Sequence, residues 1–186
     1  MTEQLYYQDS YIKDFEAVVL SCIPNGNHFE AVLDRTAFFP EGGGQCADTG
    51  VLHIENREIQ VFDVQERNGE IIHFIDKEIL PGQTVIGELD FQERFSKMQQ
   101  HTGEHIISGI VHRRFGYENV GFHLGKEEVT MDYDGPLTPE ELRSIEYEAN
   151  QVVAENREIR AYFPGTEELE KIPYRSKKNC REKFEL

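Results

Sequence analysis

The sequence predicts an α+β chain with two parts, a small β-barrel-like domain over residues 1–90 and a two-layer α+β domain over residues 91–186. Two observations support this prediction. Before residue 90, short runs of β-branched and aromatic residues are separated by turn residues, as in small barrels and curled sheets. From Phe91 onward, apolar residues recur every three to four positions, which is the period of a helix.

Six short strands are expected in the first part, because each segment is rich in β-branched or aromatic residues and ends at turn residues. The segments PNGN (24–27) and Asn68-Gly69 lie between two pairs of these strands and predict hairpins. The expected strands cover residues 15–23, 28–33, 51–54, 59–64, 70–75 and 85–89.

The second part is expected to run helix–strand–strand–helix–strand. Gly116 should end the first helix. Thr138, Pro139 and Glu141 form a helix start, with a hydroxyl cap, a proline in the first turn and a glutamate three residues after the cap. The expected elements are helix 91–115, strands 120–124 and 129–133, a helix after 138, and strand 159–163.

The chain is strongly acidic, with 19 Lys and Arg against 35 Asp and Glu and a formal net charge of −16. Its hydrophobic fraction of 38% includes enough aromatic residues to fill a core, which excludes a disordered acidic chain. No apolar run approaches the roughly 20 residues of a membrane span, and no secretory signal is evident. Cys22, Cys46 and Cys180 form no CxxC pair, which favours reduced thiols. We therefore expect a cytoplasmic protein without a membrane partner.

Positive charge collects near the C-terminal end of the sequence. Residues 171–183 contain six basic residues and one acidic residue, Glu182. Such a run is either a solvated tail, which charge alone favours, or the place where a phosphate backbone binds. The six are Lys171, Arg175, Lys177, Lys178, Arg181 and Lys183.

The segment HTGEH (101–105) is the most informative group for chemistry. His101 and His105 are four residues apart, so on a helix their side chains share one face and could bind one zinc ion. Two unrelated surface histidines are the alternative. Two ligands are also too few, because structural zinc takes four protein ligands and catalytic zinc about three.

The same segment fits HxxEH, the inverted zinc-protease motif, with Glu104 as general base. That function needs an acidic ligand on a later helix, where Glu148 and Glu155 are available. Gly103 is unusual beside a catalytic base, and the chain is short for a peptide-binding protease. We therefore rank the protease below the other interpretations.

A glycine-rich segment, TAFFPEGGGQCADTG (36–50), is the second group. Its three consecutive glycines allow positive φ and close approach of a ligand. No lysine follows in P-loop register, so a nucleotide cradle is disfavoured. A tight barrel turn would explain the glycines, but Glu41, Gln45, Asp48 and Thr49 add more polar groups than a turn requires.

Together these groups resemble the editing domain of alanyl-tRNA synthetase and its free-standing AlaX-type relatives. The similarity covers the chain from about Phe15 to Lys178. The similar segments are RTAFFPEGGGQ (35–45), DTG (48–50), QHTGEH (100–105), VGFHLG (120–125) and PYRSKK (173–178).

The resemblance implies a barrel-like domain with the glycine loop, followed by an α+β editing domain. It also implies a hydrolase: an aminoacyl-tRNA deacylase that, with zinc, cleaves the ester joining serine, or in some members glycine, to the alanine tRNA. The partner would be the 3′-terminal aminoacyl adenosine of mischarged tRNA-Ala. A tRNA-binding accessory module without catalysis is the alternative.

An alanine pocket cannot strongly reject serine, so a second site that hydrogen-bonds the extra hydroxyl is needed. The candidates for lining this catalytic pocket are Thr36, Gln45, Thr102 and His123. The candidate substrate-binding residues are Gly42, Gly43, Gly44, Arg175, Lys177 and Lys178, and the candidate metal ligands are His101 and His105.

The sequence departs from the family pattern at the metal site. Family members hold zinc with the HxxxH pair and a later CxxxH pair, but Cys180 is followed by Arg-Glu-Lys-Phe and has no histidine partner. We therefore expect a chain that lacks the C-terminal metal-ligand segment, with two of four family ligands present.

Overall fold

The computed structural model describes residues 2–125, 128–160 and 162–172, which divide into two compact units. The first unit comprises Met1–His101 and His123–Val129, and the second comprises Thr102–Phe122 and Thr130–Leu186. The predicted domain boundary at residue 90 coincides with the start of helix α1 (Phe91–Phe115), whereas the division into compact units falls within that helix.

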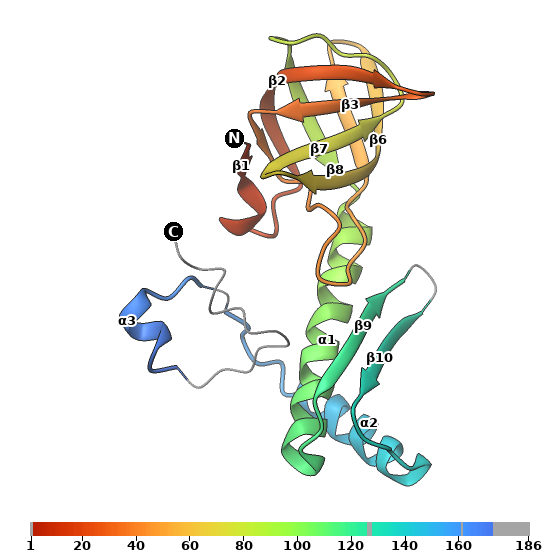
Figure 1. Ribbon diagram of the computed structural model, residues 1–186, viewed down its shortest axis with the longest axis vertical. Helices are drawn as coiled ribbons and strands as arrows, with labels where there is room; N and C mark the ends of the chain where they lie inside the picture. The colour runs from red at the N-terminus through yellow and green to blue at the C-terminus, as the bar shows by residue number, and fades with distance from the viewer. Residues whose placement is uncertain (1, 126–127, 161, 173–186) are drawn as a thin grey trace. The chain divides into compact units, whose positions relative to one another are not determined.

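The first unit contains a closed barrel of antiparallel strands, in the order β2-β3-β7-β6-β5-β8 (Figure 1). The predicted barrel-like fold and α+β class are confirmed. The barrel strands are β2 (Asp14–Asn25), β3 (His28–Leu33), β5 (Gly50–Ile54), β6 (Arg57–Arg67), β7 (Glu70–Ile75) and β8 (Thr84–Leu89). A short parallel pair, β1 (Glu3–Gln4) with β4 (Arg35–Thr36), and a 3₁₀ turn at Leu5–Tyr7 accompany them.

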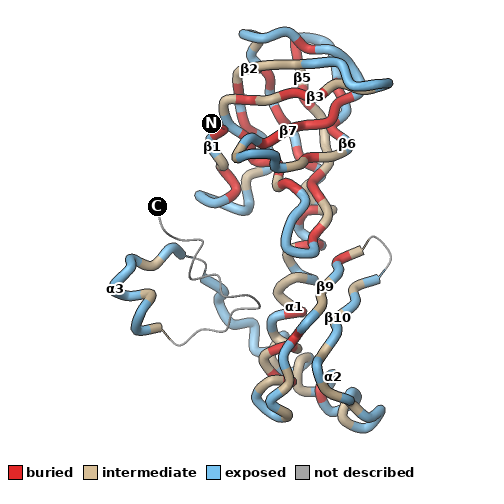
Figure 2. The backbone as a smooth tube through the Cα atoms, viewed as in Figure 1, coloured by how far each residue is buried: buried red, intermediate tan, exposed pale blue. Residues whose placement is uncertain are grey.

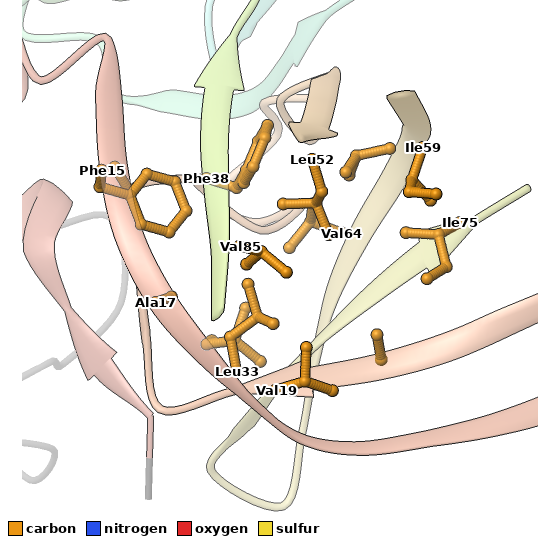
Figure 3. Packing of buried hydrophobic residues seen from close by; sticks show 14 of the residues in the cluster. Phe15, Ala17, Val19, Leu33, Phe38, Leu52, Ile59, Val64, Ile75 and Val85 are labelled. Carbon is orange, nitrogen blue, oxygen red and sulfur yellow. The ribbon is translucent and has the colours of Figure 1, made fainter. Parts of the chain in front are cut away.

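Alternation along the strands produces the barrel core. In β8, for example, the exposure pattern alternates at every residue from Thr84 to Leu89, as expected where one sheet face is buried. Figure 2 shows that buried residues recur along each barrel strand, and Figure 3 shows side chains of several strands meeting inside. Leu33, Leu52 and Ile59 are among the fully buried members of this core.

One polar pair lies inside this apolar core. His73 Nδ1 donates to the carbonyl oxygen of Ala31 over 3.2 Å, so Nε2 accepts from the hydroxyl of Thr36 over 2.8 Å. Thr36 Oγ1 also accepts from the backbone N–H of Phe38. Burial lowers the pKa of His73 from 6.5 to about 4, because the surrounding core cannot solvate an imidazolium.

A buried ion pair joins the segment after the glycines to α1. Arg94 donates to Asp48 through Nε over 2.7 Å and through Nη2. Arg94 also donates to the carbonyl oxygens of Ala37 and Ser10. Both charged side chains are at most 4% exposed. A buried charge is tolerated where a partner of opposite charge and hydrogen bonds compensate it. Here Asp48 Oδ2 accepts from Arg94 and from the backbone N–H of Phe39, so this oxygen fixes the segment against the first turns of the helix.

The second unit has its own small core of Ile110, Val111 and Ile145, from α1 and α2 (Pro139–Ala154). The predicted start of α2 is confirmed, since Thr138 and Glu141 form a capping box. Gly116 follows the end of α1 with φ 73°, as predicted for a helix stop. The remaining elements are β9 (Asn119–Leu124), β10 (Val129–Tyr133), which pairs with β9, and the short α3 (Thr166–Leu169).

The strand predicted over residues 159–163 is wrong for the described residues of that segment, which have no regular secondary structure. Ile159 and Phe163 are 70% and 71% exposed, so the alternating apolar residues have no described sheet on which to pack. None of the described helices combines the length and apolar composition needed to cross a membrane.

His73 should make the barrel acid-sensitive in a defined window. Its pKa is lower in the folded protein than the ordinary 6.5, so the unfolded chain binds the proton first and stability falls as pH drops from about 6.5 to about 4. The loss should reach roughly 3 kcal/mol below that window. Urea unfolding of the wild type and His73→Gln should show their stability difference shrinking between pH 7 and pH 4, but constant between pH 7 and pH 8. Parallel pH profiles through the acid range would contradict the assignment.

Arg94→Met should destabilise the protein by about 3–5 kcal/mol, because Asp48 is left buried without its cation. The double variant Arg94→Met/Asp48→Asn should recover part of that loss. Arg143→Met breaks an exposed pair with Glu140 and serves as the matched control, with an expected change within about 0.5 kcal/mol. Chemical unfolding measures the free energy of unfolding of all three variants. Equally small losses in Arg94→Met and Arg143→Met would show that the buried ion pair matters no more to stability than the exposed one.

Candidate functional site

The three glycines form a two-residue hairpin turn. Gly42 and Gln45 exchange backbone hydrogen bonds of 3.0 and 3.1 Å around Gly43 and Gly44, whose φ angles are 61° and 86°. Positive φ at both central positions defines a type I′ turn, which side chains other than Asn or Asp rarely allow. The tip is therefore a tight turn, which is one of the two interpretations of the glycine-rich segment from sequence. The backbone oxygen of Gly44 accepts from Leu124 N over 2.8 Å, which joins the turn to the end of β9.

Gln45 connects this turn to the first histidine of HTGEH. Its side-chain oxygen lies 3.1 Å from Nδ1 of His101 on α1. An amide oxygen only accepts, so Nδ1 carries the hydrogen. Gln45 is 7% exposed, which limits its motion. Consequently the glycine turn, Gln45 and His101 form one connected arrangement within the first unit.

The two histidines lie on one face of α1, as predicted. His101, Glu104 and His105 each offer one ligand atom, and these atoms lie within 4.8 Å of one another. Two nitrogens bound to one tetrahedral zinc ion are about 3.3 Å apart, which is within the 4.8 Å span of this group. The donors present fit two positions of a zinc site, with nitrogen ligands of the preferred kind.

Glu104 is not placed like a general base. It is 1% exposed, and its Oε1 accepts from Ser108 over 2.6 Å and from Asn119 over 2.7 Å. The later acids that a protease would need are engaged elsewhere: Glu148 pairs with Arg113 and Arg114, and Glu155 with Arg157. This geometry disfavours the HxxEH protease.

A pocket of about 470 Å³ lies within the first unit beside the glycine turn. This volume falls in the range of small-molecule sites, about 300–1,000 Å³. Lys97, on its wall, donates to the carbonyl oxygen of Ala47 over 2.6 Å and pairs with Glu93 over 2.9 Å. The lining residues are Cys46, Glu93, Ser96, Lys97, Gln100, Leu124, Gly125, Glu128 and Val129.

The other predicted site residues take different positions. His123 is exposed, and a Cβ built on Gly125 would lie 3.3 Å from its Nε2, so the ring rests against a residue of the pocket wall. Thr36 is fully buried and bonded to His73 inside the barrel. Thr102 is half-buried on α1. The predicted tRNA-binding residues Arg175, Lys177 and Lys178, like Cys180, lie outside the described residues.

Sequence reasoning missed the face of α1 that lines the pocket. Glu93, Ser96, Lys97 and Gln100 recur at spacings of three and four, so they share one helix face. A polar stripe directly before HTGEH was the available signal, but a solvated helix surface has the same pattern.

Comparisons with known proteins agree with the resemblance. Residues 3–93 match the family described as tRNA synthetases class II (A). The chain is 38% identical over 173 residues to the alanine–tRNA ligase of Ignicoccus hospitalis, covering 91% of this chain and 19% of that protein. It is 33% identical to the alanyl-tRNA editing protein AlaX-L of Pyrococcus horikoshii, covering 93% of this chain and 42% of that one.

The chain thus spans about a fifth of the ligases it matches. The overlap with the AlaX-M alanyl-tRNA editing protein of Saccharolobus solfataricus is more extensive, at 38% identity over 177 residues, 93% of this chain and 73% of that protein. At that identity and mutual coverage, the chain belongs to the AlaX family of alanyl-tRNA editing proteins.

Proposed function

We propose that this chain is a deacylase that acts in trans on mischarged alanine tRNA, hydrolysing the ester of serine or glycine with the help of zinc. The observation that supports this most directly is the 3.1 Å contact between Gln45 and His101. It joins the glycine turn to the HxxxH segment, the two parts of the sequence that resemble editing domains.

The pocket beside the turn is suited to the acylated end of a tRNA. Its volume of about 470 Å³ exceeds the needs of one small amino acid and leaves room for part of the adenosine. Ser96 and Gln100 offer hydroxyl and amide groups that can hydrogen-bond the hydroxyl of serine. Alanine would leave such groups unpaired, which is how a site favours serine over alanine.

Two charged groups on the pocket wall add a preference for a ligand with a free α-amino group. The carboxylate of Glu128 attracts the protonated α-amino group of an esterified amino acid, while Lys97 is held by Ala47 and Glu93. The α-amino group is free in aminoacyl-tRNA, whereas an amino acid whose nitrogen forms a peptide bond has no such group. The pocket therefore suits an aminoacyl ester.

His101 and His105 would hold the zinc ion, which would polarise the ester carbonyl or lower the pKa of a water molecule. The hydrogen bond that His101 Nδ1 donates to the side-chain oxygen of Gln45 orients His101 for this role. In the overall reaction, water adds to the carbonyl carbon, the ester C–O bond breaks, and the 3′-terminal ribose oxygen leaves with a proton. The products are the free amino acid and uncharged tRNA.

RNA binding would have to overcome the net charge of −16. We propose that Arg175, Lys177 and Lys178 supply phosphate contacts together with Gly42, Gly43 and Gly44, whose backbone a ligand can approach closely. Cβ atoms built on Gly42 and Gly43 meet nothing closer than 4.0 Å, consistent with space above the turn.

With zinc supplied, the protein should release serine from seryl-tRNA-Ala at least about 100-fold faster than alanine from alanyl-tRNA-Ala, because only serine pairs with the polar groups of the pocket. Ester loss followed with labelled amino acid measures both rates. Saturable tRNA binding without release of either amino acid would instead favour the accessory module. Cleavage of a casein-like substrate would favour the protease.

The variant His101→Ala/His105→Ala should bind no zinc at this site and lose more than about 100-fold of the deacylase rate, since both ligands are removed. His112→Ala is the matched control, because His112 lies on the same helix and pairs with Glu118. Metal analysis and ester hydrolysis should be measured together. A double variant that retains the wild-type rate would remove zinc from the mechanism.

A further inference from the structure

Glu104 lies directly against the second histidine of HTGEH. Its Oε2 is 3.3 Å from Nδ1 of His105. We propose that Glu104 is a positioning residue that keeps the hydrogen of His105 on Nδ1, so that Nε2 is the nitrogen presented to the metal. This inference rests on the metal site proposed above and assigns a role to a residue that the proposed reaction does not use.

The charge of the carboxylate favours a hydrogen on the nearer ring nitrogen of His105. An ionised carboxylate has no hydrogen to donate. Oε2 lies 3.3 Å from Nδ1 of His105 without the alignment of a hydrogen bond, so its influence is electrostatic: a negative charge at that distance attracts a hydrogen on Nδ1 and repels a lone pair there. In a neutral imidazole the other nitrogen then has the lone pair, and a metal binds through that lone pair.

Glu104 can fix a partner because it is itself fixed. Its other oxygen, Oε1, accepts from Ser108 Oγ and from Asn119 Nδ2. Asn119 Nδ2 also donates to Ser108 over 3.1 Å, and Ser108 Oγ lies 3.1 Å from the hydroxyl of Tyr133. These residues come from α1, β9 and β10, and all belong to the second unit. Three elements therefore hold one carboxylate, whose side chain has no exposed surface.

His105 is not held by packing as a buried histidine would be, so a polar contact is needed to orient it. Its side chain is 67% exposed, so packing alone restricts it little. Its neighbour along the helix face is held by a different group, because His101 Nδ1 donates a hydrogen bond to Gln45 Oε1. Both imidazoles of the pair thus meet a side-chain oxygen at Nδ1. Carboxylates and amides behind metal-bound histidines are worth about 10–100-fold in metal affinity.

The first test measures the tautomer of His105 in the zinc-free full-length chain by ¹⁵N NMR of the imidazole nitrogens. The wild type should show the Nδ1–H form. Glu104→Leu removes the acceptor and should shift His105 toward Nε2–H, the form that a histidine in water favours. Glu104→Gln retains an acceptor oxygen and should keep Nδ1–H. Glu148→Gln, which alters an exposed ion pair of the same unit, should change nothing.

The second test measures zinc affinity by competition with a chromophoric chelator. Affinity should fall about 10–100-fold in Glu104→Leu and by a smaller factor in Glu104→Gln. Ser108→Ala, which keeps the carboxylate but removes one bond that fixes it, should also weaken binding. If Glu104→Leu fails to fold, Glu104→Gln and Ser108→Ala still provide the comparison.

The outcomes separate this inference from the proposed function. An Nε2–H tautomer in the wild type, or unchanged affinity in the variants that fold, would overturn the positioning role alone. An equal loss in Glu104→Gln and Glu104→Leu would overturn it in favour of direct ligation by Glu104. A wild type that binds no zinc would overturn the metal site, and the positioning role with it. The expected tautomer and affinities without ester hydrolysis would support the positioning role and remove the deacylase.

Discussion

The buried ion pair between Asp48 and Arg94 is the contact on which the arrangement of the site depends. Asp48 follows Gln45 by three residues, and Arg94 precedes His101 by seven, or two turns on the same face of α1. Fixing Asp48 against Arg94 therefore fixes the position along the helix, about 10 Å further on, at which Gln45 meets His101. A shift of one residue in this contact would direct Gln45 at a different face of the helix.

Two helix cations make the glycine-rich segment rigid despite its composition. Arg94 binds the carbonyl oxygen of Ala37, and Lys97 binds that of Ala47, so both sides of the segment are held by α1. A buried ion pair adds little net stability compared with apolar packing, but it requires one geometry. The need for glycine is thus confined to the tip, where Gly43 and Gly44 have the positive φ angles of the turn.

Much of the barrel could be predicted from sequence because alternation and turn chemistry act locally. β3 and β7 have the expected bounds. The strand expected at 159–163 failed because alternation does not supply a neighbouring strand. The histidine pair followed from helical spacing, but the Arg94 contact did not, since its partner is 46 residues away in sequence and arginine usually marks a helix surface. The burial of Thr36 beside His73 likewise depends on a contact between β4 and the barrel strand β7, 37 residues apart in sequence.

The two histidines are held by different means, and this has a consequence for ligand binding. His105 is held by Glu104 within the second unit, whereas His101 is held by Gln45, which the glycine-rich segment positions. A metal bound by both histidines would favour the conformation in which Gln45 contacts His101. By linkage, a substrate that stabilises the glycine turn in that conformation must raise metal affinity by the same factor by which the metal raises substrate affinity. Under the proposed function, metal binding and recognition of the acylated end would therefore be one coupled equilibrium, connected through the amide of Gln45.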